Sequence, residues 1–144
     1  MNPLNHVASI MDGNGRWGLK NKNSRNAGHK AGLNTVEKII KETIKNKIKF
    51  LTLYAFSTEN WKRPKKEINF LFKLINKYFS LEINNVMQEG IKVNILGELN
   101  KLPKNVKDTL KNSIRLTKKN KKIIVNLAIN YGSKNEIIST LKKI

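Results

Sequence analysis

Five consecutive residues near the N-terminus combine an acid, two glycines and a cation, and could bind a metal ion beside a phosphate. They read Asp12-Gly13-Asn14-Gly15-Arg16. A carboxylate such as that of Asp12 is a common metal ligand. Because glycine has no Cβ, the backbone N–H groups of this stretch can approach an anion closely. The Arg16 guanidinium presents a fork of donors that suits phosphate oxygens. The stretch therefore predicts a site for a phosphorylated ligand.

Two further groups of polar residues could serve the same site. Arg25 and His29 stand at or near the start of a predicted helix, where free N–H groups and the helix dipole attract anions. The segment from Ser57 to Pro64 follows a second apolar run and carries hydroxyl, acidic, amide, aromatic and guanidinium groups. An arginine and a tryptophan occur in this segment as they do after Asp12, which indicates that the two segments face one crevice.

The pattern of apolar residues predicts the strands and helices that position these side chains. Short apolar runs predict buried strands, and apolar residues at helical spacing predict helices. The predicted strands cover residues 7–11, 50–56, 91–96 and 121–131, and the predicted helices start near residues 28, 65, 104 and 134, with a polar loop at 19–27. This order predicts one α/β domain over residues 1–144, a parallel sheet with helices on both faces. Ligands of such sheets bind at the carboxyl ends of the strands.

The glycines also match a dinucleotide-binding pattern, because Gly13, Gly15 and Gly18 have the spacing G-x-G-x-x-G. A dinucleotide loop should run into an apolar helix, whereas residues 19–24 are polar and unpatterned. The acid at the expected distance for a ribose, Glu37, falls inside a helical pattern. We therefore interpret the match as accidental, and an ordinary glycine-rich turn remains the plain alternative.

Composition narrows the class of protein. The chain has 144 residues, 39% of them hydrophobic, and it contains no cysteine, so it offers no disulfide and no thiolate metal site. Its formal charge of +19 would suit nucleic acid or an anionic membrane. The lysines are spread over the chain without a basic stripe or interleaved aromatics, which favours a general compositional bias over a nucleic-acid face. No signal peptide and no transmembrane run is predicted.

Four ordered motifs resemble those of the cis-prenyltransferases, specifically the bacterial undecaprenyl diphosphate synthases (isoprenyl transferases). They are His6–Trp17, Arg25–Gly32, Leu51–Pro64 and Leu127–Gly132. The resemblance extends over essentially all of the chain and implies the fold of that family. Members of the family continue through two more strands, an Arg-Thr-Gly-Gly-Glu-like segment and a late glutamate. The resemblance thus implies a chain that is C-terminally incomplete, either a fragment or a natural truncation.

The resemblance implies a Mg²⁺-dependent transferase that adds isopentenyl diphosphate units to an allylic diphosphate in cis and releases pyrophosphate. It implies that Asp12 is catalytic and binds Mg²⁺, and that Asn60 is catalytic and lies near the proton that is removed. The absence of an Asp-Asp-x-x-Asp motif argues against the all-helical trans-prenyltransferases. The implied substrate-binding residues are Gly13, Asn14, Gly15, Arg16, Trp17, Arg25, His29, Ser57, Thr58, Glu59, Trp61 and Arg63.

The same resemblance implies a role in making the undecaprenyl carrier lipid for cell-wall synthesis. It implies a cytoplasmic homodimer that contacts the inner face of the membrane to release its product, with no nucleic-acid partner. Weak or no catalysis is expected from the 144 residues alone, because the isopentenyl diphosphate site of the family lies largely in the segment not present. The alternatives are an inactive or binding-only homologue and, less favoured, a basic nucleic-acid-binding module.

Overall fold

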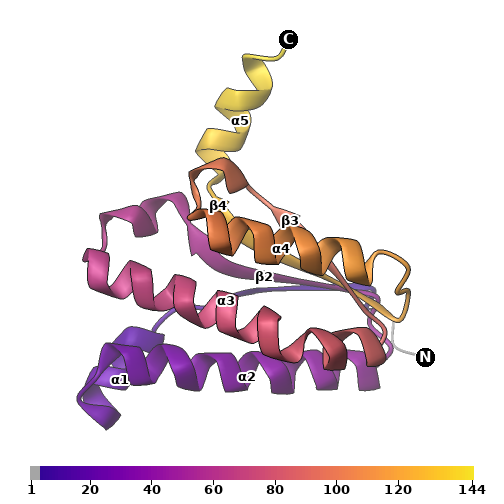
Figure 1. Cartoon of the computed structure of the whole chain (residues 1–144), viewed down its shortest axis with the longest axis horizontal. Coiled ribbons are helices and arrows are strands. Elements are labelled where there is room, and N and C mark those ends of the chain that lie inside the picture. Colours follow the sequence, from indigo (N-terminus) through magenta and orange to yellow (C-terminus); the bar gives the residue numbers. More distant parts are fainter. Residues whose placement is uncertain (1–3) are drawn as a thin grey trace.

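Four parallel strands form the centre of the protein, as the sequence predicts. In the computed structural model, which describes residues 4–144, the sheet order is β1-β2-β4-β3 (Figure 1). Leu53 of β2 pairs with Ser9 on one side and Leu127 on the other, so the second strand lies between the first and the fourth. The strands are β1 His6–Ile10, β2 Phe50–Ser57, β3 Ile91–Leu96 and β4 Ile123–Tyr131.

Helices follow every strand, and their starts agree with the local sequence signals. Pro64 and Pro103 immediately precede α3 and α4, where the fixed φ of proline suits the entry into a helix. Ser24 caps α2 by accepting a hydrogen bond from the Ala27 N–H. The helices are α1 Asn14–Lys22, α2 Arg25–Lys45, α3 Lys65–Gln88, α4 Lys104–Thr117 and α5 Ser133–Leu141, with short 3₁₀ helices at Thr58–Lys62 and Leu99–Lys101.

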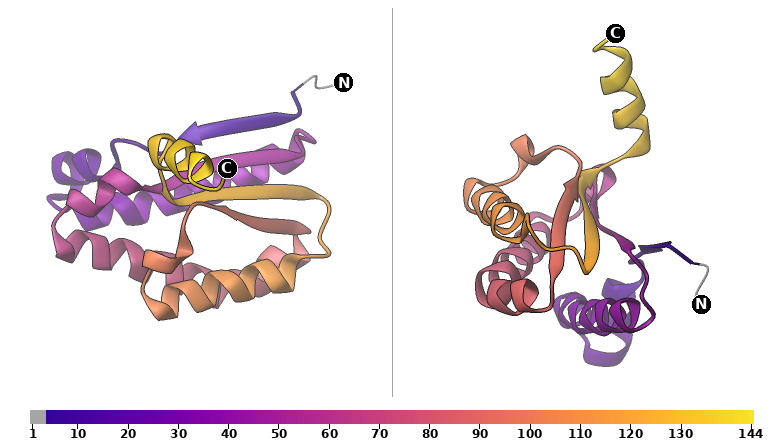
Figure 2. Two further views of the ribbon diagram at one scale, coloured as in Figure 1. Left: turned by 90° about the horizontal axis from the view of Figure 1, so that it is seen from above. Right: turned by 90° about the vertical axis from the view of Figure 1, so that its right-hand side faces the viewer.

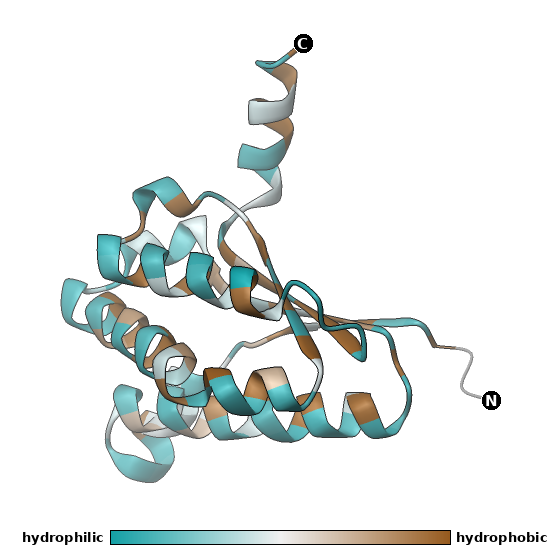
Figure 3. Ribbon diagram, turned by 45° about the vertical axis from the view of Figure 1, so that its right-hand side comes forward, coloured by the Kyte–Doolittle hydropathy of each residue, from teal (hydrophilic) through white to brown (hydrophobic). Residues whose placement is uncertain are grey.

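The apolar core lies between the sheet and helices α2, α3 and α4, which cover one face (Figure 2). Leu51 and Leu53 of β2 are fully buried there, as are Val106 and Leu110 of α4. The hydropathy colouring shows the apolar residues as bands that repeat along these helices (Figure 3). Burial of this continuous layer supplies the main driving force for folding.

The opposite face of the sheet is not covered by any helix of the described residues, so the prediction of helices on both faces is confirmed for one face only. Ile10, Tyr54 and Leu96 share one cross-sheet row on this face and are 77%, 38% and 37% exposed. Helix α5, the element that could return over them, instead extends away from the sheet edge (Figures 1 and 2). Its apolar residues Ile137 and Leu141 are exposed as well.

The prediction of a polar loop over residues 19–27 was wrong, because α1 and α2 occupy most of this stretch. Helix α1 packs against α2 through a close backbone contact and not through a stripe of apolar side chains. A Cβ on Gly28 would lie 1.9 Å from the Asn14 backbone oxygen and 2.8 Å from the Gly18 Cα. Two glycines thus let α1 and α2 touch along their backbones, which a pattern of apolar residues cannot reveal.

Candidate active site

The polar segments that follow β1 and β2 meet at one edge of the sheet. Because these two strands pair in parallel, Asp12 and Ser57 leave them at the same, carboxyl end. Gly13, with φ of 86°, turns the chain directly from Asp12 into α1. The left-handed conformation at this position favours glycine. The first turn of α1 therefore presents its N–H groups, which have no partner within the helix, beside the Asp12 carboxylate.

The Asp12 carboxylate is open to solvent and is held in place by its own loop. Its Oδ1 accepts a hydrogen bond from the Gly13 N–H at 2.6 Å, and its Oδ2 accepts one from Arg16 at 3.1 Å. Both charged side chains are 75% exposed, so the ion pair itself adds little to stability. The exposed carboxylate remains accessible to a cation or a ligand.

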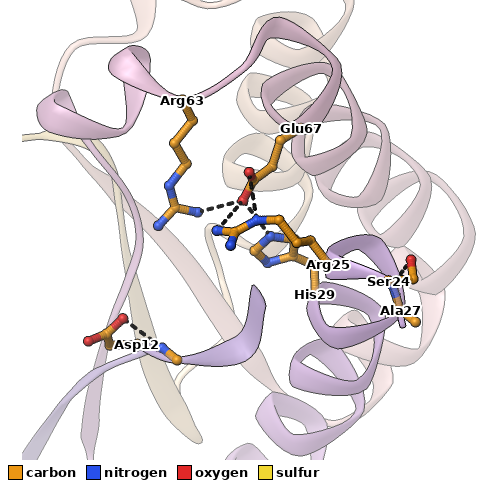
Figure 4. Close-up of polar contacts among 8 residues, drawn as sticks. Asp12, Ser24, Arg25, Ala27, His29, Arg63 and Glu67 are labelled. Carbon is orange, nitrogen blue, oxygen red and sulfur yellow. Dashed lines mark hydrogen bonds and ion pairs between the residues drawn. The ribbon is translucent and has the colours of Figure 1, made fainter. Parts of the chain in front are cut away.

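A buried carboxylate that the sequence did not single out brings three basic residues together. Glu67, only 7% exposed, accepts hydrogen bonds from Arg25 Nε at 3.0 Å, Arg25 Nη2 at 3.2 Å and His29 Nε2 at 2.9 Å. Arg63 Nη1 donates to the same carboxylate at 3.2 Å. Figure 4 shows the three basic side chains converging on Glu67, two of them from α2 and Arg63 from the segment just before α3. The only local signal was the spacing of Arg63 and Glu67 at i and i+4.

The partners of Glu67 hold its carboxyl group ionised. Burial alone would raise its pKa, but hydrogen bonds from Arg25 and His29 and the charges of Arg25 and Arg63 outweigh burial and lower the pKa below the usual 4.5. A depressed pKa in the folded state contributes stability that is present above pH 4.5 and is lost as the pH falls through the folded pKa.

We therefore expect Glu67→Gln to weaken the acid dependence of stability. Denaturant titrations between neutral and acidic pH should show the wild type losing stability faster than the variant, because only the wild type must protonate this carboxylate. Glu42→Gln is the control, since Glu42 on α2 is 64% exposed. Parallel pH profiles for the wild type and Glu67→Gln would contradict the ionised, stabilising carboxylate.

The segment after β2 is fixed by its own hydrogen bonds and by aromatic packing. Asn60 Oδ1 accepts the Ser57 N–H at 3.1 Å, which closes a capping box. Trp61 packs edge-on against Phe56, with ring centroids 5.3 Å apart, and its Nε1 donates to Asn130 Oδ1 at 2.8 Å. Asn130, near the carboxyl end of β4, thus supports the loop after β2 through this hydrogen bond.

A cavity of about 470 Å³ starts at the polar segments that follow β1 and β2 and continues between the helices and the sheet. Its inner wall is apolar and includes Leu53 of β2, Val36 of α2 and Ile75 of α3. Trp17, Thr58 and Trp61 were also predicted at the site, but they do not line this cavity; Thr58 lies against Gly132. The predicted site residues that line it are Asp12, Gly13, Asn14, Gly15, Arg16, Arg25, His29, Ser57, Glu59, Asn60 and Arg63.

A polar mouth that leads into an apolar interior fits a ligand with a charged head group and a hydrophobic tail. Comparison with known proteins points to the same class of ligand. The family model described as "Putative undecaprenyl diphosphate synthase" matches residues 10–144. The chain belongs to this family. The isoprenyl transferase of Clostridium tetani is 48% identical over 137 residues, which are 95% of this chain and 54% of that protein. That of Clostridium perfringens is 45% identical over 139 residues, 96% of this chain and 55% of that protein.

Solved structures of family members share the fold. Lavandulyl diphosphate synthase from Lavandula x intermedia, in complex with dimethylallyl diphosphate, superposes with a TM-score of 0.92 at 29% identity, covering 96% of this chain and 60% of that one. A probable undecaprenyl diphosphate synthase from Campylobacter jejuni gives a TM-score of 0.79 at 34% identity, covering 99% and 62%. The predicted family and the α/β fold with a parallel sheet packed against helices are thus confirmed.

Membership of the family bears on the remaining predictions. The family acts on isoprenoid diphosphates, and the solved lavandulyl diphosphate synthase holds dimethylallyl diphosphate. The chain spans about half the length of the curated relatives it matches. Within residues 4–144, the structure has no group of three or more side chains able to bind a metal, and no helix that is both long and apolar enough to cross a bilayer.

Proposed function

We propose that the chain provides the allylic diphosphate site of a cis-prenyltransferase. In the proposed reaction the allylic carbon–oxygen bond breaks, pyrophosphate leaves, a new bond forms to isopentenyl diphosphate, and a proton is lost. Repetition gives a long polyprenyl diphosphate such as the undecaprenyl carrier lipid. The observation that supports this best is the cavity itself, in which Arg25, His29 and Arg63 stand at the mouth and apolar side chains line the interior.

The diphosphate of the substrate would bind between the glycine loop and the cationic residues. The N–H groups at the start of α1 and the side chains of Arg16, Arg25 and His29 would stabilise the negative charge that develops on the leaving group. Asn60, whose oxygen is already engaged with the Ser57 N–H, would lie near the proton that is removed. In this proposal Asn14, Ser57, Glu59 and Arg63 line the pocket, while Trp17, Thr58 and Trp61 lie outside the cavity lining and order the segments that form it.

Asp12 is the residue that would hold Mg²⁺. A single exposed carboxylate fits this ion, because Mg²⁺ in phosphate sites keeps several waters and takes one or two carboxylates together with substrate oxygens. When bound, the metal would act as a Lewis acid on the leaving diphosphate. The open position of Asp12 beside the N–H groups of α1 leaves room for that arrangement.

The apolar cavity would hold the prenyl tail, which leads to a direct prediction. Ile75→Trp should fill part of the apolar cavity and weaken binding of farnesyl diphosphate by about tenfold or more, equivalent to ~1.4 kcal/mol. Binding of inorganic pyrophosphate should not change, because pyrophosphate has no tail to contact this apolar side chain. Leu81→Trp is the control, since Leu81 lies on α3 but is 64% exposed. Calorimetry on both ligands measures the effect, and equal losses for both would contradict the tail assignment.

We further propose that the functional protein is a cytoplasmic homodimer that touches the inner face of the membrane. The exposed apolar residues of α5 and of the open sheet face, among them Ile10 and Ile137, offer surface for association. The charge of +19 would attract anionic lipid. Light scattering after size exclusion and cosedimentation with anionic vesicles test the two points. A strictly monomeric protein that does not bind such vesicles in low salt would contradict both.

A further inference from the structure

We propose that Glu67 is the positioning residue of the diphosphate site: it holds Arg25, His29 and Arg63 in place without contacting the substrate. This inference rests on the proposed function for the identity of the ligand, but its structural part stands on the hydrogen bonds around Glu67 alone. Glu67 does not line the cavity, whereas its three partners do. It therefore lies behind the wall of the site.

The carboxylate of Glu67 is engaged by side chains of the protein. Its Oε1 accepts from Arg25 Nη2, His29 Nε2 and Arg63 Nη1, and its Oε2 accepts from Arg25 Nε. Four donors therefore point at this carboxylate, three of them at Oε1, and all four come from residues that line the cavity. Two guanidinium groups face one carboxylate, so the cluster keeps a net positive charge even when His29 is neutral. Glu67 thus orders the cations without cancelling their attraction for an anion.

The partners of Glu67 remain available to a ligand on their other edges. Glu67 uses two of the five N–H donors of Arg25 and one of those of Arg63. The two side chains are 40% and 34% exposed, so their outer edges reach the cavity mouth. Because a carboxylate only accepts hydrogen bonds, Glu67 also fixes the proton of His29 on Nε2.

The arrangement extends from Glu67 to the glycine loop through Arg25. A Cβ on Gly15 would lie 2.8 Å from Arg25 Nη2 and 3.3 Å from its Nε, so the guanidinium lies directly over this glycine. Glu67 accepts hydrogen bonds from the same two nitrogens. The carboxylate on α3 therefore sets where the Arg25 charge stands relative to the first turn of α1. Long side chains lose much rotamer freedom on being ordered, and an arginine already in place binds at lower entropic cost.

The decisive test uses inorganic pyrophosphate as the probe and two variants of the full chain. If Glu67 merely repelled anions, Glu67→Leu would bind pyrophosphate more tightly, because a negative charge is gone. A positioning role of Glu67 predicts the opposite. Glu67→Leu should bind pyrophosphate at least about tenfold more weakly by calorimetry, and Glu67→Gln, which keeps one acceptor oxygen, should lose less affinity. Glu42→Gln, an exposed acid that changes the net charge equally, should bind as the wild type does. Unchanged or tighter binding by Glu67→Leu would overturn the proposal.

A second readout separates this role from the proposed function. Nitrogen NMR of His29 should show the Nε2–H form in the wild type and a mixture of tautomers in Glu67→Leu, and an unchanged tautomer would count against positioning. If Glu67→Leu does not fold, Gly15→Ala tests the same contact from the other side. Its Cβ would displace the Arg25 guanidinium, so it should also weaken pyrophosphate binding, and wild-type binding would overturn the proposal. If the wild type itself binds no pyrophosphate, the proposed function fails, and the tautomer alone then decides the role of Glu67.

Discussion

Replacing Asp12 by asparagine is expected to abolish the effect of Mg²⁺ on pyrophosphate binding and to lower any prenyl transfer by about 10²- to 10³-fold, the range found for single groups that stabilise a developing anion. The amide keeps the shape of the side chain and can still accept the Gly13 N–H, so the loop should persist. It lacks the charge that would hold the metal. Calorimetry of pyrophosphate with and without Mg²⁺ measures the first effect, and incorporation of labelled isopentenyl diphosphate measures the second.

The other aspartate of the chain supplies the control for this experiment. Asp108 is exposed on α4 and does not line the cavity. Asp108→Asn changes the net charge by the same amount, so it should retain the wild-type response to Mg²⁺. A response to Mg²⁺ in Asp12→Asn equal to that of the wild type would show that the carboxylate does not bind the metal.

Replacing Gly28 by alanine is expected to detach α1 from α2. An alanine in the interior of a helix should stabilise it by about 1 kcal/mol relative to glycine. Here the added Cβ would lie 1.9 Å from the Asn14 backbone oxygen, and backbone atoms cannot move aside as a flexible side chain can. We expect a net loss of about 3 kcal/mol, at the upper end of the usual cost of overpacking. Because this loss of stability affects the packing of α1, whose first turn lies at the proposed diphosphate site, pyrophosphate binding should weaken as well.

Hydrogen exchange along the chain locates the consequence of this change. Amides of α1 should exchange much faster in Gly28→Ala, while those of the buried strand β2 should remain protected, since its residues Leu51 and Leu53 are fully buried elsewhere in the fold. Asn26→Ala, at an exposed position two residues earlier in α2, is the control and should change neither property. Unaltered exchange of α1 in Gly28→Ala would contradict the close packing of the two helices.

Features that depend on neighbouring residues in the chain could be predicted from the sequence. Each strand carries a short apolar run that ends in turn residues, and the Ile91–Leu96 strand begins and ends where predicted. Parallel order followed from the alternation of strands and helices, and with it the meeting of Asp12 and Ser57 at one edge. The polar side of the cavity could therefore be predicted from the sequence.

Features that depend on contacts between distant segments could not be predicted in this way. The partners of Glu67 include Arg25, which is 42 positions away, so an acid in the first turn of α3 gave no sign of its burial. Helix α1 packs through the backbone contact at Gly18 and Gly28, so it does not need the stripe of apolar residues that predicts a helix. The open face of the sheet escaped prediction for a related reason, since an apolar strand residue such as Ile10 looks the same whether or not a helix covers it.

One titration tests the central claim most directly, namely that a diphosphate head binds at the mouth and a prenyl tail binds in the cavity. The affinities of pyrophosphate, dimethylallyl diphosphate and farnesyl diphosphate are measured by calorimetry with Mg²⁺ present. Each buried methylene should add up to about 0.8 kcal/mol, so affinity should rise by at least about tenfold from the shortest tail to the longest. It should fall for all three ligands in Glu67→Leu. Equal affinity for the three ligands, or tight binding of farnesol without its diphosphate, would contradict the account.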